Sequence, residues 1–128
     1  MPVRIVRLGS PRQPGEGPRL GTVRRPPRGV RRAQFSSGNW YDVWLPNLAP
    51  SAALVAQAQR ARTATAWRAF ARKYTRELAA PDRAHLLSAL ALLSRTTNFS
   101  VGCYCDDESR CHRGLLRTIL ERHGAEVE

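Results

Sequence analysis

A short apolar stretch that leads directly into a helical pattern constrains the fold of this chain more than any other feature. Residues Asn98–Cys105, NFSVGCYC, are few and mostly apolar, and over Cys111–Gly124 the leucines and the isoleucine recur at helical spacing. A strand followed at once by a helix is typical of layered α/β domains. The sequence therefore predicts an α/β fold in which this strand belongs to a small, mostly parallel sheet.

Further elements follow from periodicity and capping. Pro2–Leu8 alternates apolar residues with arginine, as a strand does, and Arg19–Arg25 is a second strand candidate. Ser51 suits the start of a helix over residues 52–61, and apolar stripes predict helices over Thr65–Ala79 and residues 81–95. We expect the third of these helices to bury Leu86, Leu87, Leu90 and Leu93. Trp40 and Trp44 are four residues apart, and we interpret them as core residues rather than as a stacking surface for bases. With the last helix, about four helices flank the sheet, and residues 1–128 make one compact domain.

Charge is concentrated near the N-terminus. The chain has a formal net charge of +11, and nine arginines but only one acid, Glu16, lie within residues 1–35. Within this region, residues 26–39 form a basic, irregular segment that prolines keep from regular structure. Such an excess favours an anionic small molecule or nucleic acid as partner. The alternative is a compositional bias toward Ala, Arg, Leu and Pro with no binding role.

Neither a membrane span nor a signal peptide is expected. No apolar run approaches about 18 residues, and the N-terminus lacks an unbroken apolar core. We therefore expect no membrane partner and a cytoplasmic location. Thiols stay reduced in that compartment, which favours metal binding or thiol chemistry for clustered cysteines over a structural disulfide.

All three cysteines lie in the stretch Gly102–Arg113, which is the predicted functional site. Cys111 comes at the start of the last helix, where free backbone N–H groups and a positive potential favour anions. Beside Arg110 and Arg113, the pKa of the Cys111 thiol is expected to be lowered. His112 at the same helix end is expected to stay neutral and to act as an acid or base. We predict Cys111, His112 and Arg113 as catalytic residues, and Arg110, Arg28 and Arg25 as ligands of an anion.

Two other interpretations of the cysteines remain open. A zinc site could use Cys103, Cys105, Cys111 and His112, although C-x-C is tighter than usual zinc spacing and the adjacent Cys111 and His112 do not easily turn toward one ion. Alternatively, Cys103 and Cys105 are buried and Cys111 is unreactive. The C-x5-R pattern from Cys111 to Arg117 matches a phosphatase loop, but helix is expected to begin there too early to wrap a phosphate.

Several motifs together resemble the DUF488 family, in its YeaO-like branch. They are an N-terminal strand, Gly17–Arg19 ahead of Pro27–Gly29, Trp44–Ser51, the helix Phe70–Leu78 and Cys111–Arg113. In place of the V-D-R-L-W-P-R-G run common in that branch, Val23–Gly29 reads VRRPPRG. The resemblance implies an α/β fold with a small, mostly parallel sheet, and it implies no reaction. The leading hypothesis is a thiol-based enzyme or sensor that binds an anionic ligand. The alternative is a zinc-containing or arginine-rich nucleic-acid-binding module.

Overall fold

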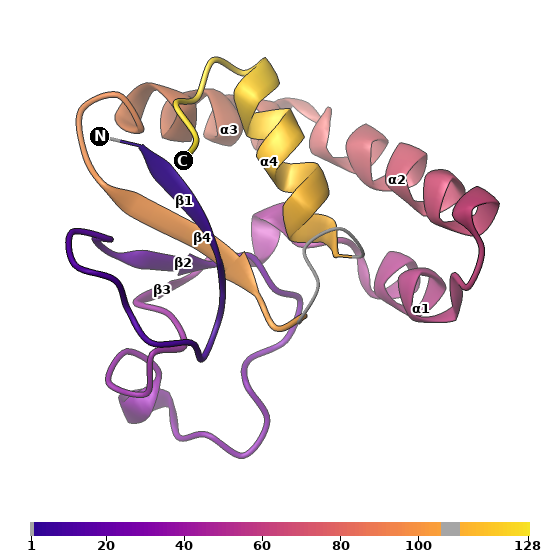
Figure 1. Cartoon of the computed structure of the whole chain (residues 1–128). Helices are drawn as coiled ribbons and strands as arrows, with labels where there is room; N and C mark the ends of the chain where they lie inside the picture. The colour runs from indigo at the N-terminus through magenta and orange to yellow at the C-terminus, as the bar shows by residue number, and fades with distance from the viewer. Residues whose placement is uncertain (1, 106–110) are drawn as a thin grey trace.

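Four parallel strands form one sheet with the order β1-β4-β2-β3 (Figure 1). The strands are β1 (Val3–Arg7), β2 (Arg19–Gly21), β3 (Val43–Trp44) and β4 (Phe99–Cys103). This computed structural model describes residues 2–105 and 111–128 of the chain. Every residue of the central strand β4 is buried, as expected for a parallel sheet covered on both faces. The predicted α/β fold with a parallel sheet is confirmed.

Four α-helices lie between and after the strands in the described chain. They are α1 (Ala52–Arg60), α2 (Ala64–Leu78), α3 (Pro81–Leu93) and α4 (His112–Arg122), with short 3-10 turns at Arg32–Gln34 and Pro46–Leu48. The Ser51 hydroxyl caps α1 by accepting from the Leu54 N–H, and Pro81 opens α3 at a position where no N–H is needed. None of the described helices is long and apolar enough to cross a membrane.

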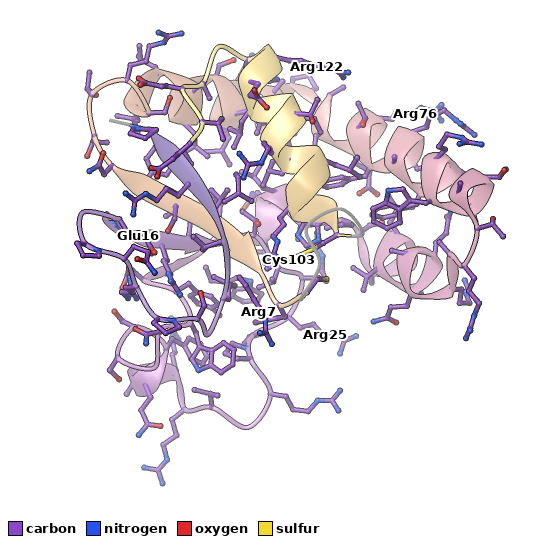
Figure 2. The ribbon with its side chains drawn as sticks, in the orientation of Figure 1. Arg7, Glu16, Arg25, Arg76, Cys103 and Arg122 are labelled. Carbon is purple, nitrogen blue, oxygen red and sulfur yellow. A yellow bond between two sulfur atoms is a disulfide. The ribbon has the colours of Figure 1, made fainter. Side chains whose placement is uncertain are left out.

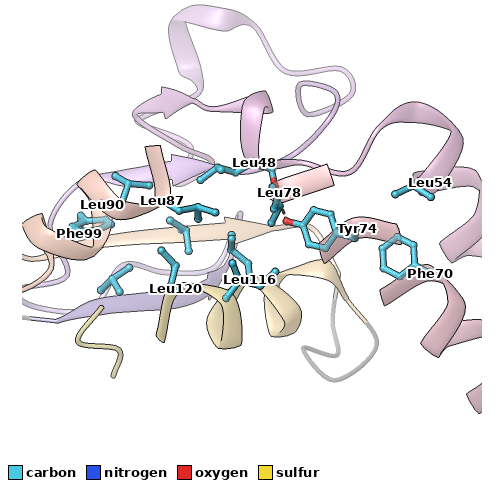
Figure 3. Packing of buried hydrophobic residues seen from close by; sticks show 13 residues of the cluster. Leu48, Leu54, Phe70, Tyr74, Leu78, Leu87, Leu90, Phe99, Leu116 and Leu120 are labelled. Carbon is cyan, nitrogen blue, oxygen red and sulfur yellow. Dashed lines mark hydrogen bonds between the residues drawn. The ribbon is translucent and has the colours of Figure 1, made fainter. Parts of the chain in front are cut away.

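The main core lies where α2, α3 and α4 meet the sheet (Figure 3). Helix α4 packs on β1 and β4, and α2 and α3 pack in turn on α4. Inside this core, the Tyr74 hydroxyl donates to the Leu48 carbonyl at 2.6 Å. The buried side chains of the main core are Val3, Leu48, Leu54, Phe70, Tyr74, Leu78, Leu87, Leu90, Phe99, Val101, Leu116, Ile119 and Leu120.

Two details of the predicted packing are wrong. Leu93, expected to be buried, is 48% exposed, because the buried face of α3 runs from Leu87 through Leu90 and Ala91 to Ser94. Ser94 is held there by its hydroxyl, which donates to the Ala91 carbonyl and accepts from the Glu126 N–H. Trp44, interpreted as a core residue, is 41% exposed on the edge strand β3, which the sequence did not predict.

A buried ion pair joins β2 to the loops around it. The Arg19 Nε lies 2.6 Å from a Glu16 carboxylate oxygen, and both side chains are almost fully buried. The same guanidinium donates to the carbonyls of Ser10, Pro11 and Asn39. Burial alone raises the pKa of Glu16, but hydrogen bonds from Arg19 and other donors outweigh it and hold that pKa below its usual value.

Replacing Glu16 by glutamine should strongly destabilise the fold. Glu16→Gln leaves the buried guanidinium of Arg19 without its counter-charge, and we expect a loss of about 3–5 kcal/mol in the free energy of unfolding. Urea titration measures this loss. The matched control is Glu128→Gln, because Glu128 pairs with Arg4 but its side chain is 55% exposed, and it should cost under ~1 kcal/mol. Equal losses in the two variants would contradict the role given to the buried pair.

Candidate functional site

The carboxyl ends of three neighbouring strands meet at one edge of the sheet. Arg7 closes β1 opposite Cys103 at the end of β4, and Thr22 directly follows β2. The Thr22 hydroxyl and N–H both donate to the Gly102 carbonyl, at 2.9 Å and 3.0 Å. Figure 2 shows Arg7, Arg25 and Cys103 on this side of the molecule. In open parallel sheets, ligands bind outside this edge, which is where the sequence placed the site.

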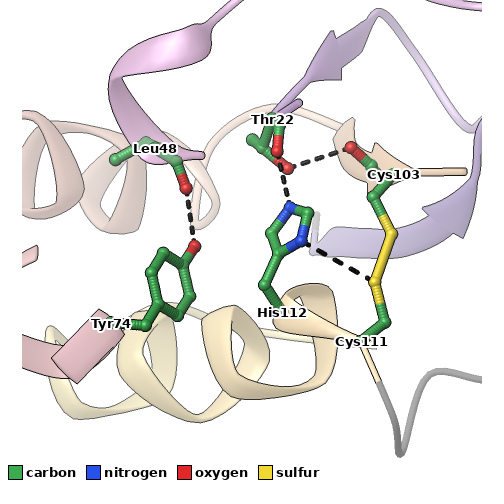
Figure 4. Close-up of a disulfide and its surroundings, with 7 residues drawn as sticks. Thr22, Leu48, Tyr74, Cys103, Cys111 and His112 are labelled. Atoms are coloured by element: carbon green, nitrogen blue, oxygen red, sulfur yellow. Dashed lines mark hydrogen bonds between the residues drawn. A yellow bond between two sulfur atoms is a disulfide. The ribbon is translucent and has the colours of Figure 1, made fainter. Parts of the chain in front are cut away.

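The start of α4 brings a second cysteine to this edge. Cys111 is the N-cap residue of α4 in extended conformation, and its sulfur is bonded to that of Cys103 in a disulfide (Figure 4). The two Cα atoms are 7.9 Å apart, beyond the roughly 4.4–6.8 Å of most disulfides. The backbone therefore holds the cysteines at a separation that also suits two separate thiols, or two thiolates on one ion.

His112 stands between β2 and the cysteine pair. Its Nε2 lies 2.6 Å from the Thr22 carbonyl oxygen, and its Nδ1 lies 3.8 Å from the Cys111 sulfur (Figure 4). A carbonyl oxygen only accepts hydrogen bonds, so Nε2 must carry the proton. In a neutral ring Nδ1 is then unprotonated, and its lone pair faces the sulfur.

The surroundings of His112 favour the neutral imidazole. Burial is the main cause that lowers the pKa of His112 to about 4, and the nearby charge of Arg113 lowers it further. The hydrogen bond to Thr22 opposes this shift without cancelling it. The Tyr74 ring meets the imidazole edge-on, with centroids 5.7 Å apart. The expectation that His112 stays neutral agrees with this environment.

A cavity of about 1460 Å³ opens at the site. It extends from the cysteine pair and His112 to residues of α1 and α2, with Trp40, Trp67 and several arginines among its lining residues. Cys103 and Cys111 themselves belong to a small second core with Leu8, Val23 and Tyr41. The sulfurs thus sit where this second core meets the cavity.

The structure brings together most of the residues predicted for the site. Cys111, His112, Arg25 and Arg28 line the cavity, while Arg113 is 5% exposed in the first turn of α4. Cys105 is exposed and lines the cavity, but it lies outside the disulfide. Arg110 falls outside the described residues.

A metal ion would find three converging ligands. The Sγ atoms of Cys103 and Cys111 and a ring nitrogen of His112 all lie within 4.8 Å of one another. The adjacent Cys111 and His112 therefore do turn toward one point, contrary to expectation, because Cys111 is still extended while His112 begins the helix. Cys105 is not part of this group of described residues.

The phosphatase-like pattern does not form a phosphate loop. Helix α4 begins at His112, immediately after Cys111, and Arg117 donates to the Glu128 carbonyl at 2.7 Å. The sequence interpretation that helix begins too early for such a loop agrees with this geometry.

Sequence reasoning missed two contributors to the site. Thr22 acts through its backbone carbonyl, which carries no side-chain signal, and it lies 90 residues before His112. Trp67 was assigned only to the apolar stripe of its helix, yet it also lines the cavity. No feature of the sequence separates it from Phe70, Tyr74 and Leu78, the buried residues of the same stripe.

Comparison with known proteins gives one match. The family model DUF488-N3a, described as the active DUF488-N3 subclade, matches residues 3–124. No curated protein and no solved structure matches the chain.

Acid should destabilise the protein through His112. The folded pKa of about 4 lies below the ordinary 6.5, so the unfolded chain binds this proton more readily. The stabilisation is complete above about pH 6.5 and is lost as the pH falls toward 4, by roughly 2–3 kcal/mol in all. Unfolding free energies at pH 7 and pH 5 test this, with His112→Gln expected to flatten the difference.

The exposed His85 on α3 provides the control for this titration. His85→Gln should keep the wild-type loss of stability between pH 7 and pH 5. If His112→Gln shows the same loss as His85→Gln, the buried neutral imidazole is not its source.

Proposed function

This chain belongs to the DUF488 family, and we propose that it is a thiol-based enzyme in which Cys111 attacks an anionic ligand and His112 accepts the thiol proton. The family match covers residues 3–124 and confirms the resemblance to the DUF488 family, without assigning the YeaO-like branch.

One observation carries the proposal. The Nδ1 of His112 lies 3.8 Å from the Cys111 sulfur while Nε2 is bound to the Thr22 carbonyl. A base that is oriented by a third group beside a nucleophile is the arrangement that activates a thiol. The proton passes from Sγ to Nδ1, and the sulfur keeps the electron pair of the S–H bond. This pair forms the new bond to an electrophilic atom of the ligand, while the bond from that atom to its leaving group breaks and the leaving group takes up the proton from Nδ1.

Charges around the pair support the same chemistry. Cys111 caps the positive end of α4, an eleven-residue helix, and such a position stabilises a thiolate. Arg113 is buried in the first turn of α4, where a positive charge favours the thiolate of Cys111, although the same charge lowers the pKa of His112. Arg25 and Arg28 line the cavity, where they attract an anionic ligand.

Cys103 decides whether Cys111 is available. In the disulfide, Cys111 has no thiolate to offer, so the dithiol is the form that attacks a ligand. The disulfide between Cys103 and Cys111 is also the kind of reversible bond that a thiol sensor needs. A sensor role therefore uses the same site in its oxidised state.

The thiol chemistry is tested by alkylation of reduced, metal-free protein with iodoacetamide. We expect Cys111 to react at least ten times more slowly in His112→Gln than in the wild type, because its proton acceptor is lost. Mass spectrometry of peptides gives the rate at each cysteine. The exposed Cys105 is the internal standard and should react equally in both proteins. An unchanged Cys111 rate in His112→Gln would reject the proposal.

A zinc ion is the second candidate, favoured by the three converging ligand atoms within 4.8 Å. Two cysteines and one histidine leave a fourth position open, as in catalytic zinc sites. The Thr22 carbonyl would serve as the outer partner that orients the histidine, because metal-binding histidines usually donate their other N–H to such a group.

Native mass spectrometry of protein purified without chelator separates the two candidates. The zinc candidate requires one zinc ion per chain, lost on Cys103→Ser, and slow alkylation until the metal is removed. The thiol candidate requires no bound metal and a Cys111 that stays reactive in Cys103→Ser. Retention of stoichiometric zinc by Cys103→Ser would contradict the ligand set.

A further inference from the structure

The cavity is larger than a thiol reaction alone requires. Its volume of about 1460 Å³ exceeds the roughly 300–1,000 Å³ of most small-molecule sites. Besides Cys111 and His112, its lining residues include Trp67 on α2 and Gln59 on α1. A ligand that fills this cavity must contact more than the reactive sulfur.

The rim of the cavity is positively charged. Among its described lining residues, four are arginines and none is an acid. Arg24 is occupied, since its guanidinium donates to the carbonyls of Pro46, Ala49 and Pro50. Arg25 and Arg28 are exposed, and their side chains make no hydrogen bond or ion pair within the described part of the chain. These two guanidinium groups are placed to receive a phosphate, for which their planar fork of donors is suited.

The walls of the cavity carry two pairs of aromatic rings. Trp67 and Phe70 on α2 have centroids 4.9 Å apart, and Trp40 and Tyr104 meet edge-on at 6.0 Å. The indole ring of Trp40 packs closely against Gly9, where an added Cβ would lie 2.9 Å from the ring. Both tryptophans are only half-buried. Half-buried indoles and exposed arginines that line one cavity are the combination that binds stacked bases and their phosphates.

We propose that the cavity binds a nucleoside phosphate, with the base against Trp67 and the phosphate at Arg25 and Arg28. The proposal rests on the proposed function in one respect, because it identifies the class of the anionic ligand that Cys111 would attack. A phosphate without a ring would leave the aromatic walls uncovered. A neutral nucleoside would leave the two guanidinium groups without a partner.

Isothermal titration calorimetry with adenosine 5′-monophosphate, adenosine and inorganic phosphate tests the two halves of this ligand. The proposal predicts that the nucleotide binds at least ten times more tightly than either part alone. Nucleotide binding that is no tighter than that of inorganic phosphate would overturn it.

Two variants test which residue binds the phosphate and which binds the base. Arg28→Gln should weaken binding of the nucleotide about tenfold and leave that of adenosine unchanged. Trp67→Leu keeps an apolar side chain on α2 but removes the flat ring, and it should weaken binding of both about tenfold. A thermal melt shows whether each variant is folded. Equal nucleotide affinity in wild type and in both variants would overturn the proposal.

A matched control lies outside the cavity. Arg68 is exposed on α2, is not among the residues that line the cavity, and donates to the Thr65 hydroxyl. Arg68→Gln should keep wild-type nucleotide affinity. If it weakens binding as much as Arg28→Gln does, the cavity is not the binding site.

A free nucleotide and a strand of nucleic acid present the same chemistry. A single-stranded hexadeoxyadenylate distinguishes the sources. Binding much tighter than that of the mononucleotide, with a steep loss at high salt, identifies a strand. Equal or weaker binding identifies the free nucleotide, and binding of neither probe refutes the proposal.

The ligand and the thiol chemistry are separated by Cys111→Ser. This variant removes the attacking sulfur, and it should bind the nucleotide with wild-type affinity. Retained binding with no enhanced Cys111 alkylation in the wild type rejects the enzyme proposal and keeps the ligand. Enhanced alkylation without nucleotide binding rejects the ligand and keeps the enzyme proposal.

Discussion

The buried ion pair between Arg19 and Glu16 is the interaction on which the site depends. Arg19 begins β2, and its guanidinium also holds the carbonyls of Ser10, Pro11 and Asn39. Two loops far apart in sequence are thereby fixed to one strand. A displacement of β2 would separate the buried guanidinium of Arg19 from Glu16, and an unpaired buried charge is costly in free energy. The ion pair therefore fixes β2 relative to these loops. Three residues further along, Thr22 presents its carbonyl to the site.

That carbonyl determines what His112 can do. By accepting a hydrogen bond from the Nε2–H it fixes the tautomer, and the fixed tautomer directs the lone pair of Nδ1 to Cys111. Burial keeps the ring neutral, so the lone pair is available at neutral pH. The same arrangement serves proton transfer from a thiol and coordination of a metal ion, since both use an unprotonated ring nitrogen. Whether the site holds a reactive thiol or a metal ion therefore depends on the state of Cys103 as well as on His112.

The sequence predicted the elements whose patterns are local. The helices over Thr65–Ala79 and Cys111–Gly124 and the buried strand before Cys105 follow from periodicity, and the structure contains all three. β3 was missed because two residues carry no period. The Thr22 contact was missed because it joins a backbone carbonyl to a side chain 90 residues away. Arg19 was noted only as the start of a strand candidate and as part of a family motif, since an arginine among many others gives no sign of being fully buried.

The tautomer of His112 is the most direct test of this account. Long-range ¹H–¹⁵N NMR of the imidazole nitrogens at pH 7, in reduced and metal-free protein, reports which nitrogen carries the proton. We predict a neutral ring that is protonated at Nε2. The signals of these imidazole nitrogens should be absent from the spectrum of His112→Gln, which identifies them. A ring protonated at Nδ1, or a charged imidazolium at pH 7, would contradict it, because no lone pair would then face Cys111.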